Sequence, residues 1–411
     1  MIHDSFARYT DFDPMVPIWI VTPDLDGCIH RFFDASSISP SGRYVGLFRF
    51  LTEGRLPEPG DAGDIVVVDL ETGEQNVVAK TRGWDTQMGA QVQWGATDEE
   101  LFFNDMDTGA WRPFGVKFNP LTGERFEMDG TVYMVSRDGK QALSPCLLRT
   151  GATQAGYGVI APVEHVPKNQ GAADDDGIYI TDTTTGKSRL LVSIREIVET
   201  AAPQFDLDDY ADGDFYGFHV KWNPQGDRIM FVLRWVSRTK GLKYGPNLIT
   251  MRADGSEICC PIQDEVWSKG GHHPDWCPDG ETVMMNLKLD DGGLRFVRAH
   301  YDGRDFEVMT SVAGSGHPTL HPNGRHIVTD EYLHASLAYG DGTTPLRWVD
   351  LETDTEQVIA RINNDPPYRG PKNELRIDPH PAWDREYKRI AFNICDEGVR
   401  RVCVADLSGL L

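Results

Sequence analysis

A short turn-and-strand pattern recurs seven times along the 411 residues and limits the chain to one kind of architecture. Each copy has a surface turn of the Pro-Asp-Gly type followed by a short apolar strand. The copies begin at Ser39, Ala96, Ser136, Asn223, Cys277, His321 and Asp384. Because self-similarity at a spacing of roughly 40 to 60 residues is typical of stacked structural units, the pattern predicts a repeat fold.

Six of the copies continue into a second apolar strand that ends in a further tight turn. These second strands begin at Ile65, Val116, Ile178, Leu248, Phe296 and Trp348. Alternating apolar residues closed by Gly-containing turns are hairpin signals. Seven units of four strands each predict an all-β fold, a seven-bladed β-propeller.

We expect residues 1–411 to form one propeller domain. The seventh unit has three strands, and the isolated strand Pro17–Thr22 is expected to supply the fourth, which closes the ring and leaves no long exposed edge. Two connections, at about 145–175 and 194–216, are too long for plain turns. They are either functional loops that cover one face or solvated decorations.

The composition excludes several classes of partner. With 40 basic and 63 acidic residues the net charge is −23, which disfavours nucleic acid and anionic membranes because both are bound by basic patches. The seven cysteines are odd in number and scattered, which argues against a disulfide framework. No signal peptide or membrane helix is apparent, so a cytoplasmic location is expected, and the oligomeric state stays open.

Four histidines occupy the same position in successive repeats, and three residues separate each of them from the start of the turn. They are His219, His273, His317 and His380, and Gln91 takes the equivalent place in the second repeat. The segment before each turn is expected to be the first strand of a blade, which lines the channel of a propeller. Equal register therefore predicts that the four imidazoles gather near one mouth of the channel. The tryptophans three residues further on are expected to pack between blades; these are Trp94, Trp222, Trp276 and Trp383.

Converging imidazoles suit a divalent transition metal or a general base at neutral pH. Asp378, two residues before His380, can add a carboxylate to such a site. Six other histidines lack the register and are expected to be structural or on the surface: His3, His165, His300, His321, His326 and His334. His272 is out of phase with His273 and is expected to point to the opposite side of its strand.

The motifs around these histidines resemble those of the oligogalacturonate lyases, family 22 of the polysaccharide lyases, which are cytoplasmic seven-bladed propellers. The resemblance lies in four short segments: Gly217-Phe-His219 with Asn223-Pro, His273 to Gly280, Ser315-Gly-His317 with Asn323-Gly324, and Asp378-Pro-His380-Pro-Ala-Trp383. Ulvan lyases of the propeller type are similar in overall plan.

The resemblance implies a role for each histidine. His219 would be the base that removes the α-proton of a uronate, and His273 and His380 would bind a divalent metal, most consistent with Mn²⁺, with Zn²⁺, Fe²⁺ and Ni²⁺ as alternatives. Asp378 stands where the family has another histidine, and His317 would complete the ligand set. Two family residues lack a match: Leu375 lies near the position of a glutamine ligand, and no arginine lies near Gly177.

β-Elimination at a uronic acid would also need an acid and groups that bind the substrate. Tyr216, Lys221 or a water could protonate the leaving oxygen, and Arg234 could pair with the carboxylate. His30, Arg31, Gln91 and Lys221 are further candidates for binding a uronate-containing oligosaccharide.

Two other classes of function fit the same fold. One is a non-catalytic propeller of the TolB or WD-repeat kind that binds a protein or a sugar. The other is a propeller glycoside hydrolase, for which Asp378 with Glu374, or Asp85, would have to act as the carboxyl pair.

Overall fold

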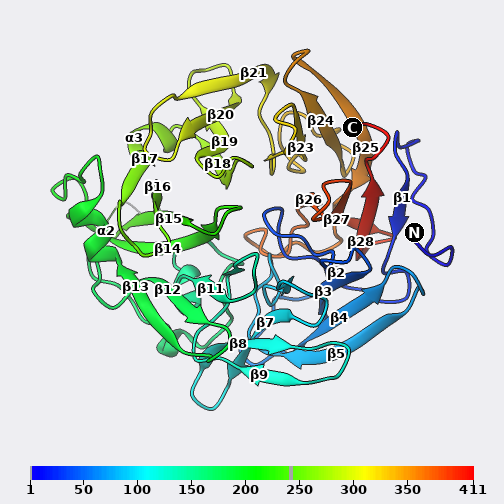
Figure 1. Cartoon of the computed structure of the whole chain (residues 1–411), viewed down its shortest axis with the longest axis horizontal. Coiled ribbons are helices and arrows are strands. Elements are labelled where there is room, and N and C mark those ends of the chain that lie inside the picture. Colours follow the sequence, from blue (N-terminus) through cyan, green and yellow to red (C-terminus); the bar gives the residue numbers. More distant parts are fainter. Residues whose placement is uncertain (1, 240–243) are drawn as a thin grey trace. The chain divides into compact units, whose positions relative to one another are not determined.

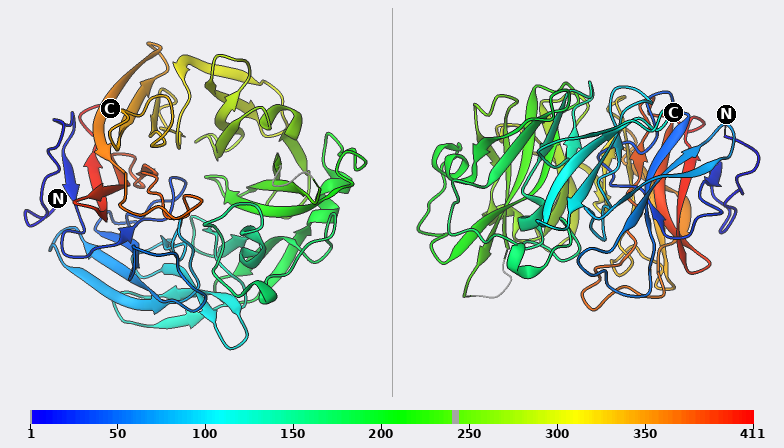
Figure 2. Two further views of the ribbon diagram at one scale, coloured as in Figure 1. Left: turned by 180° about the vertical axis from the view of Figure 1, so that it is seen from behind. Right: turned by 90° about the horizontal axis from the view of Figure 1, so that it is seen from below.

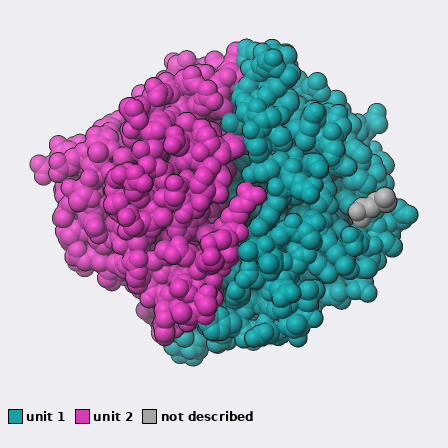
Figure 3. Space-filling view, in the orientation of Figure 1, with its two compact units in different colours: residues 1–127, 315–411 teal, residues 128–314 magenta. Residues whose placement is uncertain are grey.

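The chain folds into seven four-stranded antiparallel sheets, numbered here as blades 1 to 7 in chain order. The computed structural model describes residues 2–239 and 244–411. The blades divide into two compact units, coloured separately in Figure 3. Unit 1 comprises Met1–Glu127 and Ser315–Leu411, and unit 2 comprises Met128–Gly314.

Unit 1 contains blades 1, 2, 6 and 7 (Figure 1). Blade 1 consists of β2 (Cys28–Ile29), β3 (Tyr44–Phe50), β4 (Gly63–Asp69) and β5 (Gln75–Thr81). Blade 2 consists of β6 (Gln93–Trp94), β7 (Leu101–Asp107), β8 (Arg112–Phe118) and β9 (Arg125–Glu127). Blade 6 consists of β22 (Thr319–Leu320), β23 (His326–Thr329), β24 (Thr343–Asp350) and β25 (Thr355–Asn363). Blade 7 consists of β26 (Ala382–Trp383), β27 (Arg389–Asp396), β28 (Val399–Asp406) and β1 (Ile18–Ile20).

Unit 2 contains blades 3, 4 and 5 and the short helices. Blade 3 consists of β10 (Met134–Val135), β11 (Gln141–Ser144), β12 (Gly177–Asp182) and β13 (Ser188–Ser193). Blade 4 consists of β14 (Gly213–Trp222), β15 (Arg228–Ser237), β16 (Tyr244–Arg252) and β17 (Cys259–Ile262). Blade 5 consists of β18 (Gly271–Trp276), β19 (Thr282–Lys288), β20 (Leu294–His300) and β21 (Glu307–Ala313). The helices are α1 (Leu147–Thr150), the 3₁₀ turn Val163–His165, α2 (Ile194–Thr200) and α3 (Asp264–Trp267).

The N-terminal strand completes the last blade, as the sequence predicted. β1 pairs antiparallel with β28, with Ile18 opposite Ala405 and Ile20 opposite Cys403. The two strands, blue and red, run side by side in Figures 1 and 2. The predicted seven-bladed β-propeller is therefore confirmed, including the use of the N-terminal strand in blade 7.

The repeated turns owe their shape to a residue in the left-handed region. Gly226, Gly280 and Gly324 have φ values of 75°, 72° and 70° at equivalent places, and Tyr387 has φ 55° at the same place in blade 7. Glycine adopts this conformation without a steric cost. Each turn reverses the chain between the first and second strands of its blade, so the Pro-Asp-Gly pattern marks the blades.

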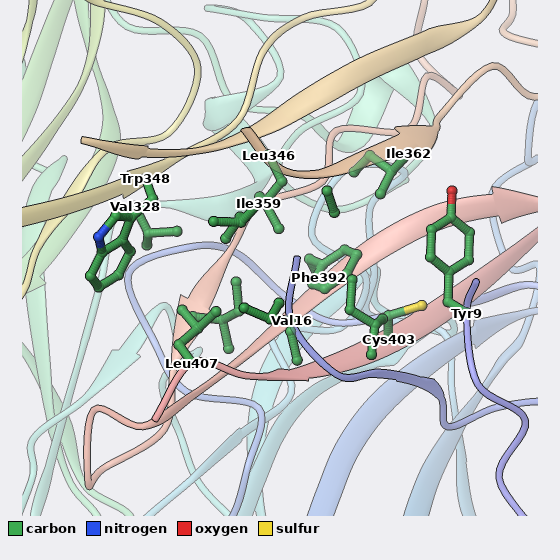
Figure 4. Close-up of a cluster of buried hydrophobic side chains, with 14 of the residues drawn as sticks. Tyr9, Val16, Val328, Leu346, Trp348, Ile359, Ile362, Phe392, Cys403 and Leu407 are labelled. Carbon is green, nitrogen blue, oxygen red and sulfur yellow. The ribbon is translucent and has the colours of Figure 1, made fainter. Parts of the chain in front are cut away.

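Apolar side chains between the blades form the core of unit 1. Figure 4 shows one cluster, which includes Leu346 and Trp348 of β24, Phe392 of β27 and Cys403 of β28. Trp383 of blade 7 packs against Trp348 of blade 6, with 6.1 Å between ring centroids. This contact is the inter-blade packing that was expected for the repeated tryptophans.

The two long connections contain short helices and ordered turns. The segment from 145 to 175 includes α1 and the 3₁₀ turn, and the segment after Ser193 begins with α2, which the Ser193 side chain caps by accepting the Glu196 N–H. Within residues 2–239 and 244–411, none of the helices has the length and apolar character needed to cross a membrane.

Candidate active site

Three buried side chains in unit 1 form a cluster with the geometry of a metal site. His317, Asp378 and His380 each offer one ligand atom, and these atoms lie within 4.8 Å of one another. His317 lies just before β22 and His380 just before β26, so the starts of blades 6 and 7 bring them together. The two imidazole rings meet edge to face, with centroids 4.3 Å apart. We call these three residues the ion-binding cluster.

A carboxylate that the sequence did not single out supports the cluster from behind. Asp330, directly after β23, lies 2.9 Å from Nδ1 of His317 and accepts the main-chain N–H groups of His317 at 2.7 Å and His380 at 2.9 Å. Burial raises the pKa of Asp330, but the attraction of His317 and these N–H donors outweigh burial, so the pKa lies below its ordinary value. With Nδ1 engaged by Asp330, Nε2 is the His317 nitrogen that would coordinate an ion.

Asp378 is held in place by neighbours of its own blade and segment. The Arg376 guanidinium donates to its carboxylate at 2.8 Å, and the Asn393 amide donates to its main-chain oxygen at 3.1 Å. Its carboxylate lies 3.8 Å from Nε2 of His380. Arg376 thus offsets part of the negative charge that this carboxylate brings into the cluster.

Two phenylalanines cover the cluster with apolar surface. Phe32 lies 4.6 Å from the His380 ring and 5.6 Å from the His317 ring, and Phe33 lies 5.3 Å from His317, all between centroids. Both phenylalanines are buried. A surround of this kind lowers the local dielectric constant and strengthens the interaction of the donors with a bound cation.

Three predicted substrate-binding residues lie in unit 1 near the phenylalanine segment. His30 is buried, with its ring 6.3 Å from His380, and burial lowers its pKa to about 4, so the ring is neutral. Arg31 donates to the Gln91 side chain at 2.8 Å and to Asp34 at 2.5 Å. Arg31 and Gln91 are therefore brought together, and their hydrogen bonds hold the segment that carries Phe32 and Phe33.

The donor set fits a divalent transition metal. Imidazole and carboxylate are ligand types that Mn²⁺, Fe²⁺ and Zn²⁺ accept. A carboxylate that is hydrogen-bonded to the second ring nitrogen, as Asp330 is to His317, is the usual support for a metal-bound histidine. His273, also predicted as a ligand, belongs to unit 2, and its role as a ligand stays a prediction.

The predicted base, His219, lies in unit 2 within a β-bulge of β14. The strand pairing with β15 shifts between Gly217 and Val220, and this shift places Phe218 and His219 outside the regular ladder. The Tyr133 hydroxyl, next to β10 of blade 3, is hydrogen-bonded to Nδ1 of His219. The His219 ring also lies 3.8 Å from Phe218 and 6.0 Å from Tyr157, between centroids.

Arg234 and Tyr216 are cross-strand partners next to this bulge. The Arg234 guanidinium stacks over Phe218 at 3.7 Å from the ring centroid and donates to Gln154 at 2.9 Å. Arg234 is thus linked to His219 through the Phe218 ring. The Tyr216 hydroxyl accepts the Asn169 N–H at 3.3 Å, and burial raises the Tyr216 pKa.

Lys221 and His273 lie where blade 4 meets blade 5. The buried Lys221 ammonium donates to the Pro274 main-chain oxygen at 2.8 Å and lies 3.3 Å from Asp275, so it joins the two blades. His273 has φ 58°, and its Nδ1 lies 2.9 Å from Nδ1 of His272. The two rings were expected on opposite sides of the strand. The bulge between His272 and Asp275 breaks that alternation and brings them into contact.

Sequence reasoning missed Tyr133 and Asp330. A signal for Asp330 was present in the sequence. In four blades, an Asn or Asp follows three residues of the strand after the repeated turn, at equivalent positions, and all four are buried. These residues are Asn104, Asn286, Asp330 and Asn393. Tyr133 had no comparable signal, since it lies 86 residues from His219 and outside the histidine register.

Comparison with known proteins finds similarity in structure. No protein-family model matches the chain, and no curated protein matches it. An oligogalacturonate lyase in complex with manganese is similar in structure, with a TM-score of 0.66 and 15% identity over 98% of this chain and 96% of that chain. An oligogalacturonate lyase from Vibrio parahaemolyticus has a TM-score of 0.67 and 13% identity over the same shares of the two chains. At these identities the likeness concerns the fold. The chain therefore shares the propeller fold of two oligogalacturonate lyases, the family that its histidine motifs resemble.

Proposed function

We propose that this protein is a metal-assisted lyase that cleaves uronic-acid-containing oligosaccharides by β-elimination. The observation that carries the proposal is the ion-binding cluster, because two histidines and an aspartate converge on one point and a second carboxylate supports them. The likeness in fold to an oligogalacturonate lyase in complex with manganese supports it. Oligogalacturonate, a pectin fragment, is accordingly the first substrate to test.

His317, Asp378 and His380 would hold the ion, and His273 stays a predicted further ligand. A divalent cation, most consistent with Mn²⁺, would neutralise the C6 carboxylate of the uronate and so make the C5 proton more acidic. Such a cation would also attract an anionic substrate to a protein whose net charge is −23.

In the proposed reaction His219 is the base. In the tautomer that this role requires, a proton on Nδ1 would donate to the Tyr133 oxygen and Nε2 would carry the lone pair. The C5–H bond breaks as the proton moves to Nε2, the electron pair forms the C4=C5 double bond, and the C4–O bond breaks. Arg234, stacked beside His219, would pair with a substrate carboxylate. Tyr216, Lys221 or a water would protonate the leaving oxygen; the Tyr216 hydroxyl accepts the Asn169 N–H, and the Lys221 ammonium donates to the Pro274 main-chain oxygen.

Two measurements test this function. Protein purified without chelator should contain about one transition-metal ion per chain, as the one cluster found among residues 2–239 and 244–411 implies. Incubation with oligogalacturonate, and in parallel with ulvan- and glucuronan-derived oligomers, should produce the ultraviolet absorbance of an unsaturated uronate. The signal should vanish in His219→Ala, which leaves the ion-binding cluster intact.

A metal-free protein would contradict the assigned ligands. A metal-bound protein that gives no unsaturated product from any of the three substrates would contradict the lyase and favour the sugar- or protein-binding propeller. Release of reducing ends without unsaturation would favour the glycoside hydrolase instead.

A further inference from the structure

We propose that Asp330 is the positioning residue of the ion-binding cluster and that the affinity of the cluster for a divalent cation depends on its carboxylate. This inference rests on the proposed function, because it requires an ion at His317, Asp378 and His380. Asp330 would not bind the ion. It acts through the two histidines that do.

The contacts of Asp330 fix both the ring and the main chain of the ligands. Oδ1 accepts the His317 main-chain N–H at 2.7 Å and lies 2.9 Å from Nδ1 of the same residue, and Oδ2 accepts the His380 main-chain N–H at 2.9 Å. A carboxylate can only accept hydrogen bonds, so the His317 proton must sit on Nδ1. The Nε2 lone pair would then be available to a bound ion in every molecule.

Two backbone conformations near the cluster depend on these contacts. His380 has φ 53°, a left-handed backbone conformation that residues other than glycine rarely adopt. Such a conformation persists only where the surrounding structure holds it in place. The bond from the His380 N–H to Asp330 is one such constraint. Gly316 has φ 48°, and a Cβ atom there would overlap Oδ1 of Asp330. Gly316 therefore lets the carboxylate approach the His317 main chain.

A second set of hydrogen bonds locks Asp330 against the Ser315-Gly316-His317 segment. The Ser315 hydroxyl donates to the Asp330 main-chain oxygen at 2.6 Å, and Thr329 donates to the Ser315 main-chain oxygen at 2.7 Å. The buried Arg347 guanidinium donates to the Ser315 hydroxyl at 2.6 Å. Asp330 is consequently held on both its main chain and its side chain.

Other blades carry an asparagine at the position that Asp330 occupies in blade 6. This comparison distinguishes the structural role of the position from its effect on a bound ion. Asn393 occupies the same register in blade 7, where its side chain accepts the His30 N–H at 2.9 Å and donates to the Asp378 main-chain oxygen at 3.1 Å. Asn104 and Asn286 occupy it in blades 2 and 5. An amide thus suffices to hold the start of a blade. Blades 6 and 7 both contribute a histidine ring to the ion-binding cluster, and the carboxylate stands in blade 6, where it lies 2.9 Å from Nδ1 of His317.

The test compares Asp330→Asn with the unchanged protein and a matched control. The control is Asp69→Asn. Asp69, at the end of β4, is also a buried carboxylate of unit 1 that accepts two main-chain N–H groups. Its side-chain partner is an arginine. Calorimetric titration of the metal-free full chain with Mn²⁺ should show binding about 10- to 100-fold weaker in Asp330→Asn, the usual effect of losing such a partner, and unchanged in Asp69→Asn. The visible absorption of the Co²⁺-loaded protein should also change in Asp330→Asn alone.

The outcomes separate this inference from the proposed function. If the unchanged protein binds neither Mn²⁺ nor Co²⁺, the ion-binding cluster itself is wrong. If the unchanged protein binds one ion and Asp330→Asn binds it within twofold and with the same Co²⁺ spectrum, the role of Asp330 is overturned while the cluster stands. Should Asp330→Asn fail to fold, Gly316→Ala keeps the carboxylate but displaces it, and it should weaken Mn²⁺ binding; unchanged affinity there would equally overturn the inference.

Discussion

Single hydrogen bonds decide the chemistry of the two histidines at the centre of the proposed reaction. His317 is bonded through Nδ1 to Asp330, and His219 through Nδ1 to Tyr133. In both, the partner of Nδ1 determines what Nε2 can do. A carboxylate partner suits a metal ligand, and a phenol partner suits a base that must take up and release a proton.

Replacing Tyr133 with Phe should slow the lyase reaction while leaving metal content unchanged. The variant loses the hydrogen bond that orients His219, worth ~1.5–3 kcal/mol when it forms to a charged group, so kcat/KM should fall about 10- to 100-fold. Tyr157→Phe is the matched control, because the Tyr157 ring lies near His219 at 6.0 Å and the change removes only a hydroxyl. Equal rates for the two variants would remove Tyr133 from the mechanism.

At the scale of strands, the ion-binding cluster links the segments that begin β22 and β26. An ion there would bind the folded chain and not the unfolded one, so it should stabilise unit 1. With Mn²⁺ at 100 times its dissociation constant the gain is ~2.7 kcal/mol. The melting temperature of the unchanged protein should therefore rise on adding Mn²⁺ and fall with chelator. His380→Ala should show no such response, and His321→Ala, a histidine of blade 6 outside the cluster, should respond normally.

The N-terminal strand provides a test of the blade architecture. Ile18 is fully buried in the pairing of β1 with β28, so Ile18→Ala should destabilise the protein by ~2–5 kcal/mol. Ile20, on the same strand, is only partly buried, and Ile20→Ala should cost less. Urea unfolding of both variants measures the difference. A larger loss for Ile20→Ala would mean that the edge of blade 7 is packed differently.

The strands were predictable because their signals are local. The turn residues and the apolar alternation lie next to each other in the chain. The strands that follow the seven repeated turns therefore begin a few residues after those turns; they are β3, β7, β11, β15, β19, β23 and β27. The contact between His272 and His273 was not predictable in this way. A β-bulge between His272 and Asp275 breaks the alternation of side chains between the two faces of the strand. Where a bulge forms depends on how the two strands pair.

For the molecule as a whole, net charge is the property most relevant to an anionic substrate. A charge of −23 repels oligouronates, and salt screens that repulsion over a distance of about 10 Å at 0.1 M. KM for a uronate oligomer should thus decrease as NaCl is raised from low concentration to about 0.1 M. A KM that instead increases with salt would show that local positive charge dominates the approach of the substrate.

The sequence by itself determined the class of fold, the number of blades, the use of the N-terminal strand and the register of the four histidines. Each of these follows from periodicity or from adjacency along the chain. The tertiary structure decided which side chains meet: Asp330 reaches His380 across 50 residues, and Tyr133 reaches His219 across 86. Such contacts depend on how side chains of neighbouring blades pack, and the spacing of residues along the chain does not show which side chains meet there.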